Sequence, residues 1–294
     1  MEPIPFDKRS GKIWYNGKLV EWKDANVHIL NHGLHYASCV FEGERVYDGE
    51  IFKLREHTVR LIHSAKRMGI TIPYSADEID KASKEIVSVQ NVLNGYVRPV
   101  VWRGSEMMAI SAQKNKIHMA IATWEWGSYF DPQIKIKGIK LDISKWAKPS
   151  PNSIPWDTKA SGLYMISTLS KHEAEKNGYH DALMMDYQGN IAEATGANIF
   201  FINSLKNEIH TPIPDSFLDG ITRRTIIDIA KKLQVKVVER KIKPTEMKEF
   251  DSCFLTGTAA EVTPVSQIGE FKFKVVELIS KLDDYYLKLV NRKI

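Results

Sequence analysis

Segments with helical periodicity alternate with short apolar runs along the whole chain, and this alternation is the feature that most constrains the fold. In residues 54–68 the side chains of Leu54, Leu61 and Met68 share one face, and Gly69 follows as a natural C-cap. The apolar runs have the length of buried strands and end in turn-forming residues. The sequence therefore predicts an α/β protein.

The first part of the chain is predicted to be a smaller domain of α+β character. Asn16-Gly17 favours a type I′ turn, because both central positions of that turn need positive φ. Ser75 and Glu78 have the spacing of a capping box at a helix start. The elements expected here are a hairpin with strands at 13–15 and 18–20, helices at 54–68 and from residue 75 onward, and strands at 96–102 and 117–123.

The second part resumes after a connector at 124–133. From Lys135 to Lys148 lysines alternate with isoleucine and leucine, which favours a half-buried strand with one wet face, and the prolines that follow predict an ordered loop. The elements expected are strands at 139–143, 182–186, 198–202, 235–238 and 253–256, and helices at 163–177, at 221–233 and at the C-terminus. We therefore predict two unlike domains, 1–127 and 135–294, joined by a loop at 128–134.

Composition excludes several classes of protein. The chain has 294 residues, of which 43% are hydrophobic and 26% charged, as in an ordinary globular protein. No apolar run approaches the roughly 20 residues that cross a bilayer, and the N-terminus lacks the apolar segment of a secretory signal. The net charge of +5 is spread along the chain, so no nucleic-acid partner is expected. Cys39 and Cys253 are expected to be reduced thiols in a cytoplasmic protein.

Several familiar chemical signatures are absent from the sequence. There is no G-x-G-x-x-G and no Walker loop. His172-Glu173 begins like a zinc-protease motif, but Lys176 stands where the second histidine is required. His28, His32 and His35 have a spacing that metal ligands can have, yet no carboxylate or cysteine pattern accompanies them. A structural role is favoured for these histidines, and no metal is expected.

Four segments combine small residues with groups that can bind a ligand. Lys159 follows the proline-rich loop, and Glu193 lies between two expected strands. Residues 218–223 enter a helix whose free N-terminal amides suit a phosphate, and residues 256–264 bring hydroxyls after a buried strand. Taken singly, each segment has an ordinary alternative: a solvated lysine, an exposed turn carboxylate, a capped helix start and a tight turn.

Together these segments resemble the fold-type IV pyridoxal-phosphate enzymes, and specifically the branched-chain amino-acid aminotransferases. The resemblance covers nearly the whole chain, in order and in spacing. It is carried by Asp24-Ala25-Asn26-Val27-His28, Gly33-Leu34-His35-Tyr36, Val40-Phe41-Glu42-Gly43, Tyr96-Val97-Arg98-Pro99, Lys159 to Tyr164, Glu193 to Asn198, Gly220-Ile221-Thr222-Arg223 and Thr256 to Glu261. It implies a two-domain fold of the D-amino-acid aminotransferase type, with pyridoxal 5′-phosphate bound in the larger C-terminal domain.

The resemblance also implies a role for each matching cofactor residue. Lys159 matches the lysine that forms the Schiff base and then moves the proton between Cα and C4′. Glu193 matches the carboxylate that keeps the pyridine nitrogen protonated. Arg60 matches a phosphate-binding arginine, and Tyr164 matches the donor to the phenolic oxygen. The other matching cofactor positions are Leu218, Gly220, Ile221, Thr222, Gly257 and Thr258.

The implied substrate pocket takes an apolar side chain in one half-reaction and the carboxylate chain of glutamate in the other. Arg98 matches the arginine that binds this carboxylate. Thr258, Ala259 and the Tyr96 hydroxyl match groups near the α-carboxylate. The aromatic lining corresponds to Tyr36, Phe41, Trp126, Tyr129 and Tyr164.

In this family the Tyr36 segment and the loop near Met107 come from the neighbouring subunit. The resemblance therefore implies a homodimer at least, with a hexamer as a larger assembly. Glu106 in that loop would disfavour apolar substrates if it pointed inward, and we expect it to face away.

The implied activity is reversible amino transfer from L-leucine, L-isoleucine or L-valine to 2-oxoglutarate, with ping-pong kinetics. D-amino-acid transaminase, R-amine transaminase and aminodeoxychorismate lyase are the alternatives on the same fold. Tyr96-x-Arg98 and Thr258-Ala259 favour the branched-chain enzyme. A non-catalytic relative is disfavoured because Lys159, Glu193 and Arg60 are all present, and function depends on such sites rather than on the fold.

Overall fold

The computed structural model describes residues 4–127 and 132–294, and their contacts divide the chain into two units. The first unit ends at Gly127 but also contains Thr158–Gly162, and the second contains the remaining residues. Sequence analysis assigned all of 135–294 to the second domain. The short segment joins the first unit because Ala160 forms an antiparallel bridge with Val40, a contact that the local sequence does not encode.

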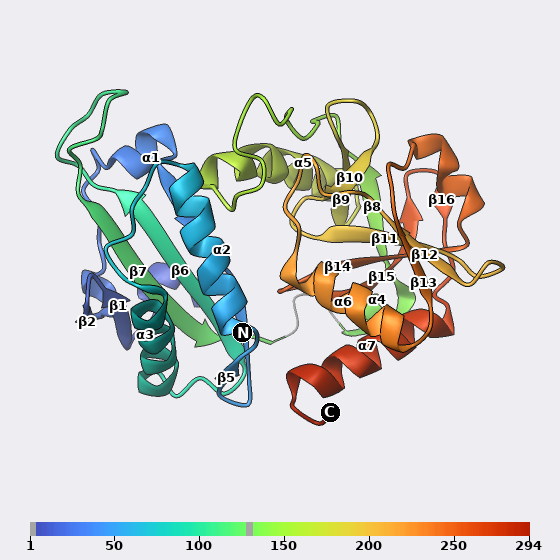
Figure 1. Cartoon of the computed structure of the whole chain (residues 1–294), viewed down its shortest axis with the longest axis horizontal. Coiled ribbons are helices and arrows are strands. Elements are labelled where there is room, and N and C mark those ends of the chain that lie inside the picture. Colours follow the sequence, from blue (N-terminus) through green and yellow to red (C-terminus); the bar gives the residue numbers. More distant parts are fainter. Residues whose placement is uncertain (1–3, 128–131) are drawn as a thin grey trace. The chain divides into compact units, whose positions relative to one another are not determined.

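The first unit is built on a seven-stranded antiparallel sheet. Its strands are β1 (Lys12–Tyr15), β2 (Lys18–Glu21), β3 (Cys39–Phe41), β4 (Glu44–Tyr47), β5 (Glu50–Ile51), β6 (Gly95–Arg103) and β7 (Ile117–Glu125). They follow the order β2-β1-β7-β6-β4-β5, and β3 also pairs with β6. Helices α2 (Leu54–Arg67) and α3 (Ala76–Val89) lie along this sheet, and the short α1 (His32–Tyr36) lies near one end of β6 (Figure 1).

The core of the first unit lies between these two helices and one face of the sheet. Leu61 of α2 and Ile86 of α3 are completely buried, as are Val97 and Val101 of β6. Side chains alternate along a strand, so the even-numbered residues of β6 point to the opposite face. Arg98 is one of these residues, and the fold therefore directs it away from the helices.

Local turn and cap signals in the first unit are confirmed. Asn16 and Gly17 both have positive φ, 49° and 86°, as a type I′ turn requires. Ser75 and Glu78 make both hydrogen bonds of the capping box at the start of α3. Gly69 follows α2 with a φ of 64°, which a residue with a side chain rarely adopts.

The second unit contains a nine-stranded mixed sheet. Its strands are β8 (Ile139–Ile143), β9 (Asp181–Met185), β10 (Ile191–Ala194), β11 (Asn198–Asn203), β12 (Glu208–Thr211), β13 (Lys236–Glu239), β14 (Ser252–Gly257), β15 (Glu261–Ile268) and β16 (Phe271–Lys272). The strand path β10-β9-β8-β15-β14-β11 closes on itself, because β10 also pairs with β11. Its interior is apolar, with side chains such as Leu141, Leu183 and Ile199 completely buried.

Four helices accompany this sheet: α4 (Pro132–Lys137), α5 (Tyr164–Lys176), α6 (Ile221–Lys232) and α7 (Glu277–Val290). Strands β8 and β9 are parallel, and such a pair needs a long crossover, which α5 supplies. Helices α6 and α7 pack against each other, α6 on β14 and α7 on β15 (Figure 1). Among the described residues no helix is both long and apolar enough to span a bilayer.

Two expectations for the second unit are wrong. The stretch from Lys135 does not begin as a strand, because the residues up to 137 belong to α4, which ends before Gly138 at a φ of 80°. Ile136 of α4 is 75% exposed, so the alternation does not reflect a strand before Gly138. It does so at 139–143, which form β8 as expected, with Ile139 and Leu141 buried and Lys140 exposed. Glu193 lies within strand β10 rather than between two strands.

Candidate active site

Lys159 is held on the first unit by its own backbone. Its amide donates to the hydroxyl of Ser64 on α2 over 3.0 Å, and its carbonyl accepts from the amide of Phe41 over 3.1 Å. The Lys159 Nζ lies 4.9 Å from the centroid of the Phe41 ring. Burial, aided by the Arg60 charge, lowers the pKa of this ammonium to about 8, while the Glu42 carboxylate opposes the shift. A lysine with this pKa supplies neutral amine near physiological pH.

Four of the predicted substrate residues of the first unit are connected through a series of contacts that starts at the same Phe41 ring. The Arg98 guanidinium carbon lies 4.8 Å from its centroid and 5.4 Å from that of Tyr96. Trp126 packs edge-on against Tyr96, with ring centroids 4.6 Å apart. Four predicted residues, Phe41, Tyr96, Arg98 and Trp126, are thus brought together with Lys159.

A buried carboxylate, Glu42, lies next to these groups and was not predicted as a site residue. It accepts two hydrogen bonds from Arg60, at 2.6 and 2.9 Å, and lies 2.7 Å from His57 Nδ1. The Arg60 and His57 charges hold the pKa of Glu42 well below its usual range, against the effect of burial. Arg60 therefore has an acidic partner within its own unit, and its predicted role on the cofactor phosphate stays a prediction.

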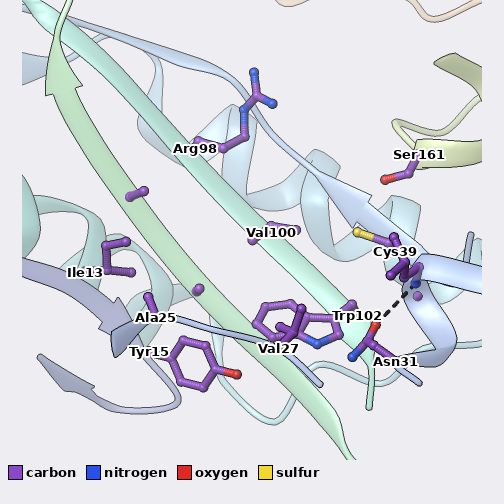
Figure 2. A pocket seen from close by; sticks show the side chains of 14 residues that line it. Ile13, Tyr15, Ala25, Val27, Asn31, Cys39, Arg98, Val100, Trp102 and Ser161 are labelled. Atoms are coloured by element: carbon purple, nitrogen blue, oxygen red, sulfur yellow. Dashed lines mark hydrogen bonds between the residues drawn. The ribbon is translucent and has the colours of Figure 1, made fainter. Parts of the chain in front are cut away.

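A cavity of about 390 Å³ lies on the face of this sheet opposite α2 and α3. Figure 2 shows Arg98, Val100 and Trp102 spaced along β6, with Arg98 and Trp102 toward opposite ends of the pocket. Most of the remaining lining is apolar, contributed by residues such as Ile13 and Val27. The cavity thus places the guanidinium of Arg98, a group that binds carboxylates, beside an apolar surface.

On the second unit, Glu193 is the centre of a buried polar group. Its Oε1 lies 2.8 Å from the ammonium of Lys148, and its Oε2 accepts from the side-chain amide of Asn198 over 3.0 Å. Lys148 is positioned by its backbone amide, which donates to the carbonyl of Met185. The ammonium stabilises the negative charge on Glu193, which suits a carboxylate that holds a protonated ring nitrogen.

The predicted phosphate-cup residues begin helix α6. Gly220 is its N-cap and, having no side chain, makes no side-chain capping hydrogen bond of its own. Ile221 and Thr222 occupy the first turn, where backbone amides lack partners within the helix. Leu218 connects this loop to the strands, because its carbonyl accepts from Asn198 over 3.0 Å. These features fit an anion at the helix start.

The remaining predicted cup residues follow strand β14. Gly257 ends the strand, and Thr258 and Ala259 form the half-buried turn before β15. A side chain at Gly257 would lie 3.5 Å from Ala197, so this turn is next to the turn that joins β10 and β11. The second unit therefore gathers Glu193 and the whole predicted phosphate cup apart from Arg60.

Other predicted residues are placed differently or lie outside the described chain. Tyr36 is on α1, is 42% exposed and packs near His32. Tyr164 is the first residue of α5 in the second unit. Tyr129 lies outside the described residues, as does most of the predicted 128–134 loop. Glu106 is exposed and accepts from the Lys116 amide within its own loop, while its orientation toward a neighbouring subunit stays a prediction.

The three histidines near residue 30 make local hydrogen bonds. His32 is buried between the Ser38 hydroxyl and the Ala109 carbonyl, at 3.0 and 2.9 Å. His28 Nδ1 accepts from the amide of Leu30, and His35 Nε2 lies 2.9 Å from the carbonyl of Ile29. In the described ranges no group of three or more potential ligands is arranged for a metal.

Lys148 and Asn198, which contact Glu193, were not among the site residues predicted from the sequence. Lys148 was one of several lysines in a stretch interpreted as the wet side of a strand. Asn198 was part of the motif from Glu193 to Asn198 but was given no role. A polar residue directly across a tight turn from a carboxylate could have indicated a hydrogen bond between the two. Glu42 was likewise quoted in its motif without a function.

Residues 39–268 match the family model of the class IV aminotransferases, and the chain belongs to this family. A protein of Rickettsia felis named as a probable branched-chain-amino-acid aminotransferase is 44% identical over 99% of this chain and 100% of its own length. The branched-chain-amino-acid aminotransferase of Pseudomonas aeruginosa is 41% identical over 97% of this chain and 94% of its own.

Solved structures lead to the same family. The T.th. branched-chain amino acid aminotransferase with pyridoxamine 5′-phosphate has a TM-score of 0.93 and 35% identity, covering 97% of this chain and 96% of that one. The branched-chain aminotransferase of Thermoproteus uzoniensis with norvaline has a TM-score of 0.92 and 33% identity, with the same coverage. The family and the fold class predicted from the sequence are confirmed.

Proposed function

We propose that this chain is a pyridoxal 5′-phosphate-dependent aminotransferase that moves the amino group of L-leucine, L-isoleucine or L-valine to 2-oxoglutarate, reversibly. The relatives and solved neighbours named above are branched-chain aminotransferases, and one of the structures contains pyridoxamine 5′-phosphate. The observation that carries the proposal is the state of the Lys159 amine: its pKa is about 8, and it lies over the Phe41 ring, which Arg98 also contacts.

The residues present fit this cofactor. Glu193 is buried with a cation at 2.8 Å, as a partner of a pyridinium nitrogen should be. Helix α6 begins at a glycine, which supplies no capping side chain of its own, and such a helix start suits a phosphate. The Thr256 hydroxyl is buried and has no hydrogen-bond partner in the described part of the chain, so a donor is available beside the same site.

In the proposed reaction the bound cofactor supplies an electron sink for the electron pair released at the substrate Cα. Lys159 provides the neutral amine that removes and returns the proton. Glu193, braced by Lys148, keeps a proton on the ring nitrogen. Thr222, Thr258 and the amides at the start of α6 hold the phosphate, with Arg60 as a further cation.

Substrate selection is assigned to the first unit. Arg98 offers a fork of donors for the side-chain carboxylate of glutamate, and the rings of Phe41 and Trp126 offer apolar surface for a branched side chain. Tyr36 and Tyr129 are assigned to the same aromatic lining. Thr258, Ala259 and the Tyr96 hydroxyl are assigned to the α-carboxylate.

The functional form is proposed to be a homodimer, in which the Tyr36 segment and the loop near Met107 complete the site of the partner. Both segments carry exposed apolar side chains in the single chain, which supports a covered surface. The exposed residues are Val27, Ile29, Leu30, Leu34, Met107, Met108 and Ile110. A hexamer and a cytoplasmic location stay predictions.

The test is the visible absorption band of the holoenzyme after addition of L-leucine or, separately, D-alanine. Bleaching by L-leucine alone is expected. Bleaching by D-alanine alone would assign the chain to the D-amino-acid branch, and elimination without amino transfer would indicate a lyase. In Lys159→Ala the covalent band and turnover are expected to be lost with the fold intact. Lys84→Ala, an exposed lysine on α3 of the first unit, is the matched control and should behave like the parent.

A further inference from the structure

Three polar side chains lie abreast on one face of the sheet in the second unit. Glu193 of β10 is the register partner of Asn198 of β11, and Asn198 is the register partner of Thr256 of β14. Directly opposed residues of antiparallel strands point to the same face. The turn at 195–197 therefore brings Asn198 next to the carboxylate of Glu193.

Asn198 uses its whole side-chain amide to connect two parts of the site. Its Nδ2 donates to Glu193 Oε2 and to the carbonyl of Leu218, each over 3.0 Å, and its Oδ1 accepts from the amide of Gly220 over 3.1 Å. Both N–H groups and the carbonyl oxygen are thus engaged, and the side chain is buried. The opposite orientation of the amide would place its oxygen against two acceptors, so the three partners determine one orientation.

Gly220 makes this contact possible by lacking a side chain. Its φ of −67° and ψ of 139° are open to any residue, so the backbone conformation does not require glycine. A Cβ at this position would lie 2.2 Å from Asn198 Oδ1. The start of α6 can therefore approach Asn198 closely only because residue 220 is glycine.

We propose that Asn198 is a positioning residue that sets the distance between the Glu193 carboxylate and the start of helix α6. This inference rests on the proposed function, which assigns Glu193 to the pyridine nitrogen and the α6 start to the phosphate. Lys148 fixes the other oxygen of Glu193, so Asn198 and Lys148 together determine the orientation of the carboxylate. Because the cofactor ring is rigid, the carboxylate that binds its nitrogen and the helix start that binds its phosphate must lie at the correct distance from each other.

The first test uses the full-length chain stripped of cofactor, with binding followed by tryptophan fluorescence. The probes are pyridoxal 5′-phosphate, pyridoxal and inorganic phosphate. Pyridoxal measures binding at Glu193, and inorganic phosphate measures binding at the start of α6. Asn198→Ala is expected to weaken pyridoxal 5′-phosphate about 10- to 100-fold, because it removes a hydrogen bond to a carboxylate. Both partial probes should weaken as well.

The second test asks whether a change at the phosphate end reaches the pyridine end. Gly220→Ala should weaken pyridoxal, which has no phosphate, because the new Cβ displaces Asn198. The double variant with Asn198→Ala and Gly220→Ala should then bind pyridoxal as well as Gly220→Ala alone, or better, because the new Cβ no longer meets the Asn198 side chain. Effects that multiply instead would overturn the proposal.

Asn203→Ala is the matched control, because Asn203 is also on β11 but donates to the carbonyl of Glu249 at the far end of the strand. It should bind all three probes like the parent. If Asn198→Ala unfolds, pyridoxal binding by the single variant Gly220→Ala decides alone. Normal pyridoxal binding by Gly220→Ala refutes the positioning role.

Glu193→Gln separates this inference from the proposed function. If Glu193→Gln weakens pyridoxal and Asn198→Ala does not, the positioning role is wrong while the assignment of Glu193 stands. If Glu193→Gln binds pyridoxal like the parent, that assignment fails and the positioning role fails with it.

Discussion

At the residue scale, two neighbouring buried carboxyl groups have pKa values shifted in opposite directions. Glu42 has Arg60 and His57 as partners, and their charges lower its pKa. Glu44 is also buried, but neither of its oxygens has a hydrogen-bond partner among the described residues. Burial and the nearby charges of Glu42 and Asp80 raise the pKa of Glu44 well above 4.5. The folded chain therefore favours ionisation of Glu42 and disfavours ionisation of Glu44.

This difference predicts a pH dependence of stability. The pKa of Glu44 is higher in the folded chain than in the unfolded chain, so the folded state binds the proton more tightly, and the free energy of unfolding falls as pH rises above about 4.5. Glu44→Gln stays uncharged and should be more stable than the parent at pH 8, by about 1–3 kcal/mol, with little difference at pH 4.

Thermal unfolding at fixed protein concentration across this pH range measures the effect of Glu44→Gln. Glu50→Gln on the adjacent strand β5 is the control, because Glu50 is exposed and should show no such dependence. A constant gap between Glu44→Gln and the parent at all pH values would contradict the prediction.

Arg98 provides a second prediction at this scale. Its guanidinium is expected to bind the side-chain carboxylate of glutamate but not the side chain of leucine. Arg98→Ala should slow the glutamate half-reaction about 10- to 100-fold more than the leucine half-reaction, as expected for the loss of charge-assisted hydrogen bonds. Single-turnover absorbance changes measure each half-reaction separately.

The control for Arg98 is Arg103→Ala on the same strand. Arg103 is at an odd-numbered position of β6 and donates to the carbonyls of Ala112 and Gly69, away from Phe41. Equal losses in both half-reactions of Arg98→Ala would refute the assigned role.

At the element scale, a short-range signal determines where helix α3 of the first unit begins. The capping box at Ser75 satisfies amides that the helix itself leaves unpaired. Ser75→Ala should lower the free energy of unfolding by about 1 kcal/mol, while cofactor affinity stays unchanged. Ser88→Ala, at an exposed position of the same helix, should be neutral or slightly stabilising. Denaturant unfolding and cofactor titration would test both, and a loss of affinity in Ser75→Ala would argue against a purely structural cap.

At the scale of the whole molecule, the exposed apolar segments of the first unit predict a subunit interface. Ile110 is 84% exposed in the loop that also contains Met107. A carboxylate there would be buried unpaired in a dimer, so Ile110→Asp should shift the protein to monomers and reduce turnover about 10-fold or more. Sedimentation velocity and steady-state assays measure the two effects. Leu205→Asp is the control because Leu205 is fully exposed in the second unit. A dimer that survives Ile110→Asp would contradict this placement of the interface.

The sequence by itself determined the features that depend on residues close along the chain. Asn16-Gly17, the Ser75 cap and Gly69 each act within a few residues, and the structure has the turn, helix start and helix end that they predict. The family was also accessible, because its motifs are short runs whose order along the chain is preserved. Lys159 and Glu193 were selected from such runs.

Tertiary structure alone decided the contacts between residues far apart in sequence. The bridge between Val40 and Ala160 assigns the lysine segment to the first unit, and the hydrogen bonds of Asn198 with Leu218 and Gly220 join β11 to the start of α6. The ion pair of Lys148 with Glu193 joins a loop to a strand. Local propensity and periodicity describe only near neighbours, whereas these contacts arise from strand register and the packing of distant segments.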